Sequence, residues 1–199
     1  TICIIGDPAT RYREDPVRML RALRFAAKLD FDIEDDTANA IDECSHLLGN
    51  IPSARLFDEF LKLFLSGYAA ATLDKLLEFG LFEALFPDSA SCLGDDELAL
   101  PLLRSAMQNT DARIAQEKPV TPAFILAAIL WPEVSRLEKL MRNRGDAPMV
   151  AMHSAGQEAV SNAVKIVSIP KRFTQAMREI WEFQLRLERK HGRKAAELV

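Results

Sequence analysis

Glu14, Asp15 and Arg18 lie near the N-terminus, and their types and spacing suit recognition of a nucleobase. An aspartate and an arginine three residues apart occupy neighbouring positions in the first turn of a helix. Together they present a hydrogen-bond acceptor and a planar donor fork, which can pair with the edge of a base. A helix cap with a local ion pair, worth about 1 kcal/mol, fits the same spacing. On spacing alone, the cap is the simpler interpretation.

No other set of polar residues forms a convincing catalytic centre. Asp30 and Asp32 have the acid-x-acid spacing of many metal-dependent phosphoryl-transfer sites, but no Gly-Ser phosphate loop precedes them. The histidines have no mutual spacing suited to a metal or a catalytic triad. The three cysteines form no CxxC pair, so we expect buried free thiols. The sequence therefore predicts neither a catalytic residue nor a metal site in this chain.

Positive charge is concentrated near both ends of a chain whose net charge is -4. Residues 11–28 have a net charge of +4, with two carboxylates against six basic residues: Arg11, Arg13, Arg18, Arg21, Arg24 and Lys28. Residues 171–194 have a net charge of +5, with three glutamates against eight basic residues: Lys171, Arg172, Arg178, Arg186, Arg189, Lys190, Arg193 and Lys194. Residues 29–170 carry -11. This segregation is typical of polyanion binding, with solvated or mutually attracting faces as the alternative.

Helical periodicity covers almost the whole sequence. Asp15 suits an N-cap and Pro16 the first helical position, which predicts a helix over 16–29 with a basic stripe beside two apolar rows. A helix capped by Asp36 or Thr37 should end near Gly49. Further helices are expected at 53–67, 68–87 with a break at Gly80, 95–109, 122–130, 133–143, 147–166 and 171–191. Residues 1–6 give the only strand candidate, so we predict an all-α fold with at most one short N-terminal strand.

Composition and length bound the class of protein. The chain has 199 residues, of which 49% are hydrophobic and 27% charged, as in a folded globular protein. No apolar run approaches the roughly 20 residues of a membrane span, and the N-terminus has no signal-peptide pattern, so we expect a cytoplasmic protein without membrane contact. The polar stretch 88–96 is the best candidate boundary between two helical units. Because the chain opens at Thr1, we expect a piece of a longer product.

The segment IGDPATRYREDPVRMLRALRFAAKL resembles the junction segment of the class II nucleotidyltransferases, which comprise tRNA CCA-adding enzymes and bacterial poly(A) polymerases. Several later segments resemble the poly(A) polymerase branch: IPSARLFDEFLKLFLSGY, GLFEALFP, QNTDARI, TPAFILAAILW and IPKRFTQAMREIWEFQLRLERKHGRKA. The resemblance spans nearly the whole chain. It implies that residues 1–10 end a catalytic head that is otherwise missing, that 11–87 form a helical neck, and that 88–199 form a helical body.

The resemblance also implies roles for individual residues. The family's EDxxR element falls on Glu14, Asp15 and Arg18, so Asp15 and Arg18 would pair with the base of ATP while Glu14 fixes the arginine. Arg21 and Arg24 would lie near phosphate or RNA. A Glu-Arg pair of the neck becomes Ala54-Arg55 here, so only Arg55 carries over as a nucleotide-binding residue. The other basic residues of both clusters, from Arg11, Arg13 and Lys28 to the eight of 171–194, would bind RNA.

The reaction that the resemblance implies is adenylyl transfer from ATP to RNA 3′ ends. Mg²⁺ would be held by the head and none by this chain, so the chain alone should be inactive. Its expected partners are therefore ATP and RNA 3′ ends. Two alternatives stay open: a CCA-adding enzyme, and a non-catalytic helical module whose basic stripe meets an acidic protein surface.

Overall fold

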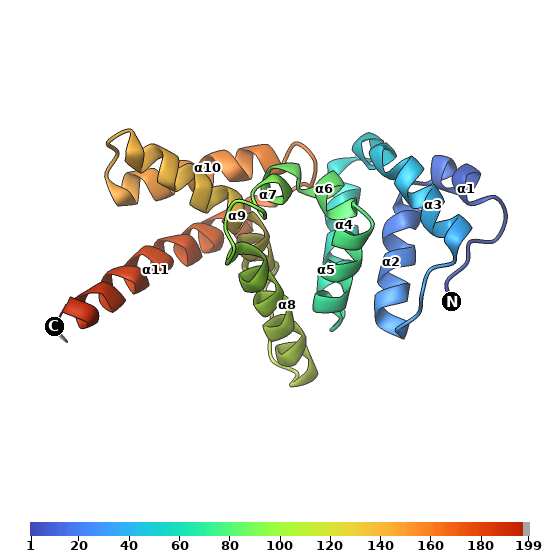
Figure 1. The fold of residues 1–199 in the computed structure, drawn as a ribbon, viewed down its shortest axis with the longest axis horizontal. Coiled ribbons are helices and arrows are strands. Elements are labelled where there is room, and N and C mark those ends of the chain that lie inside the picture. Colours follow the sequence, from blue (N-terminus) through green and yellow to red (C-terminus); the bar gives the residue numbers. More distant parts are fainter. Residues whose placement is uncertain (197–199) are drawn as a thin grey trace.

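Helices account for most of the computed structural model, which describes residues 1–196 and their side chains as far as Leu187 (Figure 1). Within the described residues, the only β-type pairing is an isolated parallel bridge between Ile2 and Ile33. Two backbone hydrogen bonds make it, Ile2 N–H to Asp32 O at 2.7 Å and Glu34 N–H to Ile2 O at 2.9 Å. The all-α prediction is therefore confirmed, and the expected strand is reduced to one bridged residue.

The N-terminal part of the molecule consists of short helices. They are α1 (Pro8–Glu14), α2 (Val17–Leu29), α3 (Asp35–Cys44), the 3₁₀ helix η1 (Ser45–Asn50), α4 (Ser53–Phe64), α5 (Ala69–Glu78), α6 (Leu81–Leu85) and α7 (Pro87–Ser91). The sequence analysis missed α1, although Asp7 accepts the Thr10 N–H and Pro8 occupies a first-turn position. The expected cap at Asp36 or Thr37 is wrong, because Glu34 accepts the Thr37 N–H at 3.0 Å.

Longer helices follow: α8 (Ala99–Ala115), α9 (Pro122–Asn143), α10 (Pro148–Ala163) and α11 (Lys171–Ala196). The two helices predicted at 122–130 and 133–143 are one continuous helix that passes through Pro132. Pro132 has no N–H for the carbonyl four residues earlier, which normally breaks a helix. Here α9 packs against α7, α8, α10 and α11, and this burial outweighs the lost hydrogen bond.

A single cluster of buried hydrophobic side chains extends from Tyr12 to Leu185. Phe57 of α4 lies 5.9 Å from Phe60 and 6.1 Å from Phe173 of α11, measured between ring centroids. Aromatic contacts therefore join the segments on either side of residues 88–96. The division into a neck at 11–87 and a body at 88–199 stays a prediction.

The motif QNTDARI has a structural role that its sequence does not reveal. Asp111 accepts the backbone N–H groups of Ala69 at 2.6 Å and Ala70 at 2.9 Å, and so caps α5 from the neighbouring helix α8. Thr110 is buried and donates to the Ala106 carbonyl. The two hydrogen bonds of Asp111 fix the position of α8 relative to α5.

The free thiols are buried at Cys44 and Cys92, as expected, but Cys3 is exposed, because it lies in the extended N-terminal segment. As far as the described chain extends, we find no helix with the length and apolar character that crossing a membrane demands.

Trp181 joins three helices in the C-terminal part. Its indole N–H donates to the Ala127 carbonyl of α9 at 3.1 Å, and its side chain is buried. A Cβ added to Gly156 of α10 would lie 2.8 Å from two ring carbons of Trp181. Helix α10 can therefore approach α11 this closely only because position 156 is glycine.

Gly156→Ala should lower the free energy of unfolding by about 1–3 kcal/mol, because the added methyl group forces the Trp181 ring or a helix to shift. At an unhindered helix interior, the same change stabilises by roughly 0.5–1 kcal/mol. Urea denaturation measures the effect. Gly49→Ala is the control, since nothing lies within 4 Å of its added Cβ. Equal or greater stability of Gly156→Ala would contradict the packing described.

Candidate functional site

The turn between α1 and α2 positions the residues of the EDxxR element. Helix α1 ends at Glu14, and Asp15 has an extended backbone that donates its N–H to the Arg11 carbonyl. Tyr12 is buried at 0% exposure and contacts the Thr37 carbonyl through its hydroxyl at 3.5 Å, which anchors α1 on α3. This burial raises the pKa of Tyr12 well above its usual value. Hydrogen bonds from Thr10 lower the pKa of the capping residue Asp7.

Asp15 binds Arg55 rather than capping α2. Nη2 of Arg55 donates to both carboxylate oxygens of Asp15, at 2.8 and 3.0 Å. The N-cap position of α2 is Pro16, which makes no side-chain cap, so the predicted Asp15 cap is wrong. The cause is tertiary, because the start of α4 brings Arg55 to a carboxylate 40 residues earlier in the chain.

Glu14 holds two arginines. Its Oε2 lies 2.8 Å from Nη1 of Arg11 and 3.7 Å from Nη1 of Arg18. Glu14 orients the guanidinium of Arg18. The Arg18 side chain is about one third exposed, so it remains open to solvent. The structure thus brings Glu14, Asp15, Arg18 and Arg55 close together. Arg18 is paired with Glu14, and Asp15 is paired with Arg55.

Arg21 is tied to α4 through a buried glutamate. Nη2 of Arg21 lies 3.5 Å from Oε1 of Glu59, which also receives Lys62 at 2.8 Å. Glu59 is only 3% exposed. The sequence analysis did not single out Glu59, although a glutamate beside the apolar stripe of the predicted helix 53–67 is the signal that could have identified it.

An open hollow of about 270 Å³ lies where α2 meets the N-terminal segment. It is lined by Arg11 of α1, by Arg18, Arg21, Ala22 and Phe25 of α2, and by residues 2–5. Phe25 is 44% exposed. The sequence analysis did not identify this ring, which lies within the basic stripe of α2.

Arg24 belongs to the stripe but has a different environment from the arginines in the hollow. Its guanidinium lies 5.0 Å from the centroid of the Phe25 ring. Within the described chain, its Nε is buried and has no hydrogen-bond partner. Arg13 and Lys28 are exposed on the same part of the molecule.

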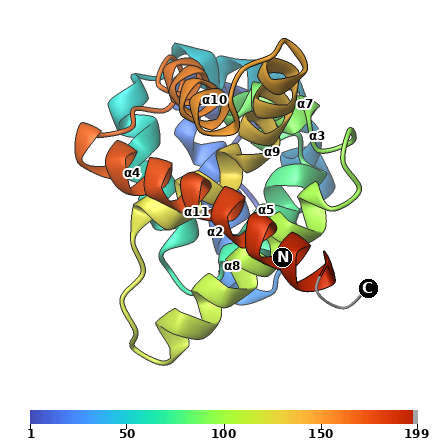
Figure 2. The ribbon, with the colours of Figure 1, turned by 90° about the vertical axis from the view of Figure 1, so that its left-hand side faces the viewer.

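The distal basic residues belong to α11, which runs from the middle of the molecule to the end of the long axis that lies opposite the N-terminus (Figure 1). In Figure 2 this helix crosses the face of the molecule that is turned toward the viewer. Lys171, Arg172 and Arg186 are exposed there. The guanidinium of Arg172 lies 4.7 Å from the Phe173 centroid, and that of Arg186 lies 5.3 Å from the Phe183 centroid. Arg178 is half-buried, with an Nε that has no partner among the described residues.

Four predicted RNA-binding residues, Arg189, Lys190, Arg193 and Lys194, lie outside the side chains that the structure describes. Their backbone continues α11. Among the described residues, no cation of α11 lines the hollow at α2, so the nucleotide candidate at α2 and the RNA candidate at α11 are separate surfaces.

No group of three or more His, Cys, Asp or Glu side chains in the described part of the chain is arranged to hold a metal ion. The carboxylates near α2 do not fit such a role, because Glu14, Asp15 and Glu59 are each bound to cationic side chains.

Comparison with known proteins identifies relatives along the whole sequence. Residues 30–93 match a family model described as a probable RNA and SrmB-binding site of polymerase A, and residues 144–199 match one described as the arginine-rich C-terminus of polymerase A. Poly(A) polymerase I of Salmonella typhimurium is 42% identical over 201 aligned residues, which cover 100% of this chain and 43% of that protein. The chain belongs to the poly(A) polymerase family. It thus spans less than half of the length of this relative.

Poly(A) polymerase I of Haemophilus influenzae is 40% identical over 95% of this chain and 42% of its own length. A CCA-adding enzyme of Pediococcus pentosaceus is 33% identical over 83% of the chain and 45% of its own length. Within the poly(A) polymerase family, Arg55 falls inside the RNA-binding model and α11 inside the arginine-rich model. Glu14, Asp15 and Arg18 precede both matched ranges.

A double-mutant cycle tests the Asp15–Arg55 contact. Because both side chains are partly exposed, we expect a coupling free energy of about 0.2–1 kcal/mol between Asp15→Ala and Arg55→Ala in urea denaturation. Arg55→Lys, which keeps the charge but not the planar fork, should retain only part of this coupling. Strict additivity of the two alanine substitutions would contradict the contact.

Proposed function

We propose that this chain selects the base of ATP and holds RNA within a polymerase that adds AMP to RNA 3′ ends. The hollow at α2 carries the proposal, because Arg11, Arg18 and Arg21 line it together with the exposed Phe25. Guanidinium groups can bind the phosphates of a nucleotide, and an aromatic ring can stack on a base.

Base selection would use Asp15 and Arg18. A carboxylate offers about four lone-pair sites, of which Arg55 occupies only part, so Asp15 can still accept a hydrogen bond. A side-chain acceptor beside a side-chain donor can pair with a base edge that presents an amino group beside an acceptor ring nitrogen. Adenine and cytosine present that pattern, whereas guanine and uracil present a carbonyl oxygen in place of the amino group. The pair therefore favours ATP and CTP over GTP and UTP.

Polyadenylation is the better supported of the two nucleotidyltransferase reactions. The relatives named poly(A) polymerase I match 95–100% of the chain at 40–42% identity. Three relatives named CCA-adding enzymes match between 41% and 83% of it. The third reading, a non-catalytic helical module, gains no support from a hollow that Arg11 of α1 lines together with Arg18 and Arg21 of α2.

The RNA-binding part of the proposal is tested with a labelled oligo(A) of about 12 nucleotides at roughly 50–300 mM salt. Binding should weaken steeply with salt. On a single strand, each phosphate contact contributes about 0.7 to the slope of the logarithm of the binding constant against the logarithm of the salt concentration. Arg172→Ala/Arg186→Ala should therefore reduce the slope by about 1.4. Lys75→Ala/Arg104→Ala is the control, because it removes two cations that are paired with Glu78 and Asp74.

Absence of oligo(A) binding at the lowest salt would overturn the proposal. An equal loss in the control pair would show that net charge alone, and not the surface of α11, determines affinity. Preferential binding of a tRNA over oligo(A) would favour CCA addition.

The base-selecting role is tested in the complete polymerase that contains this chain. Asp15→Ala and Arg18→Ala should each lower the preference for ATP over GTP by about 10- to 100-fold, since a bidentate base contact is worth roughly 1–3 kcal/mol. Single-nucleotide incorporation measures the ratio. Arg24→Ala is the matched control. The chain of 199 residues alone should incorporate no AMP; incorporation by it, or unchanged discrimination in both variants, would contradict the assignment.

A further inference from the structure

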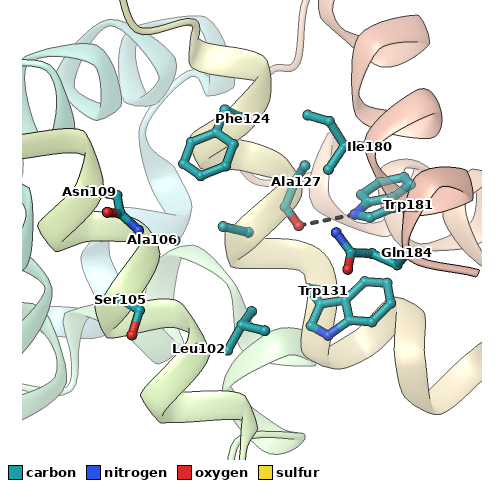
Figure 3. Close-up of a pocket in the computed structure, with 11 residues that line it drawn as sticks. Leu102, Ser105, Ala106, Asn109, Phe124, Ala127, Trp131, Ile180, Trp181 and Gln184 are labelled. Carbon is teal, nitrogen blue, oxygen red and sulfur yellow. Dashed lines mark hydrogen bonds between the residues drawn. The ribbon is translucent and has the colours of Figure 1, made fainter. Parts of the chain in front are cut away.

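A second pocket lies between α8, α9 and α11, away from the hollow at α2 (Figure 3). Its volume is about 250 Å³. Ligand pockets for drug-sized molecules start near 300 Å³, so this one suits a smaller ring system. The role proposed above for the α2 hollow does not use it.

The pocket has aromatic and aliphatic walls. Phe124 and Trp131 of α9 and Ile180 of α11 face the opening, and the buried ring of Trp181 lies behind them (Figure 3). Phe124 is 36% exposed and Trp131 is half-buried, so both rings remain accessible to a ligand. Flat apolar walls of this kind favour a planar ligand that can stack.

Polar groups face the same space. The amides of Asn109 and Gln184 project from α8 and α11 on opposite sides of the pocket, with Ser105 one turn before Asn109 (Figure 3). These three side chains make no hydrogen bond to any described residue. In the QNTDARI motif, Thr110 and Asp111 have structural partners, whereas Asn109 has none among the described residues and lines the pocket. Asn and Gln amides offer a donor and an acceptor together, which matches the edge of a nucleobase.

A cation lies on the same face of α8. Ser105, Asn109 and Arg113 follow at intervals of four residues, so they share one side of the helix. Arg113 donates to the Pro119 carbonyl at 3.0 and 3.3 Å, and no carboxylate of the described chain pairs with it. Arg113 lies one turn beyond Asn109, and its charge is not neutralised by a described carboxylate, so it can attract a phosphate to this end of the pocket.

We propose that this pocket binds a nucleobase of the RNA strand, stacked on the aromatic walls, read by Asn109 and Gln184, and with a flanking phosphate on Arg113. The inference rests on the RNA binding proposed above and adds a site to it. A hydrophobic side chain of a partner protein would fill the walls but would leave both amides without hydrogen bonds, and it has no use for Arg113. The chemistry thus favours a nucleotide unit over a protein anchor.

Intrinsic fluorescence tests the proposal directly, because the chain has two tryptophans and both line this pocket. Titration with unlabelled oligo(A) should change tryptophan emission with the same midpoint as binding measured by anisotropy of the labelled strand. Asn109→Ala and Gln184→Ala should each raise that midpoint by about fivefold or more, the loss expected for one hydrogen bond. Gln108→Ala, an exposed neighbour on α8 that does not line the pocket, should leave the midpoint unchanged.

Trp131→Phe provides a second check, since it keeps an aromatic wall but removes a reporter. It should reduce the emission change while leaving the anisotropy midpoint within about twofold of the original. Circular dichroism establishes that each variant retains the helical fold.

The outcomes separate this inference from the proposed function. If oligo(A) binds with no change in emission, and Asn109→Ala and Gln184→Ala bind normally, the pocket proposal fails while RNA binding stands. If oligo(A) does not bind at all, the proposed function itself fails. If AMP changes the emission at the same concentration as oligo(A), the pocket takes free mononucleotides, and the assignment to the RNA strand is wrong.

Discussion

The burial of Trp181 is the interaction on which the C-terminal half of the molecule depends. Its N–H binds the Ala127 carbonyl of α9, and its ring occupies the space that a side chain at Gly156 would take. Five residues after Ala127, Pro132 leaves one carbonyl of α9 without its usual amide partner. The contacts of α9 with α7, α8, α10 and α11 keep that helix intact. Trp181 therefore sets the direction of α11 and forms part of the pocket beneath it.

The two basic surfaces differ in how their cations are held. At α2, Glu14 orients Arg11 and Arg18, and the buried Glu59 holds Arg21. These carboxylates fix the positions of the arginines but offset part of their positive charge. At α11, Arg172 and Arg186 lie over phenyl rings, and among the described residues no carboxylate forms an ion pair with either of them. Fixed donors suit recognition of one small group, whereas cations without carboxylate partners suit a long polyanion. The contrast supports different roles for the two ends.

Local signals made most helices predictable, and tertiary contacts account for the errors. The helix predicted at 16–29 is observed at Val17–Leu29, because the apolar rows and the turn that ends the helix are local to this stretch of sequence. The role of Asp15 was not predictable, since its partner Arg55 is 40 residues away. Asp111 likewise caps a helix that starts 42 residues earlier. The pocket between α8, α9 and α11 had no local signal, because its walls come from three helices. Helix α1 was predictable from Asp7 and Pro8 and was overlooked.

One core joins the two ends of the molecule and fixes the spacing between them. The start of α4 carries Arg55 toward the α2 site, and it also contacts the segment before α11, where the Ser168 N–H donates to the Ser53 carbonyl at 3.1 Å. Phe57 and Phe173 pack together just beyond that bond. Both surfaces are therefore attached directly to α4, the α2 site through the Asp15–Arg55 ion pair and α11 through the Ser53–Ser168 hydrogen bond and the Phe57–Phe173 contact. An RNA strand bound at α11 as proposed would meet the α2 hollow at a distance that the packing sets, independent of the RNA sequence.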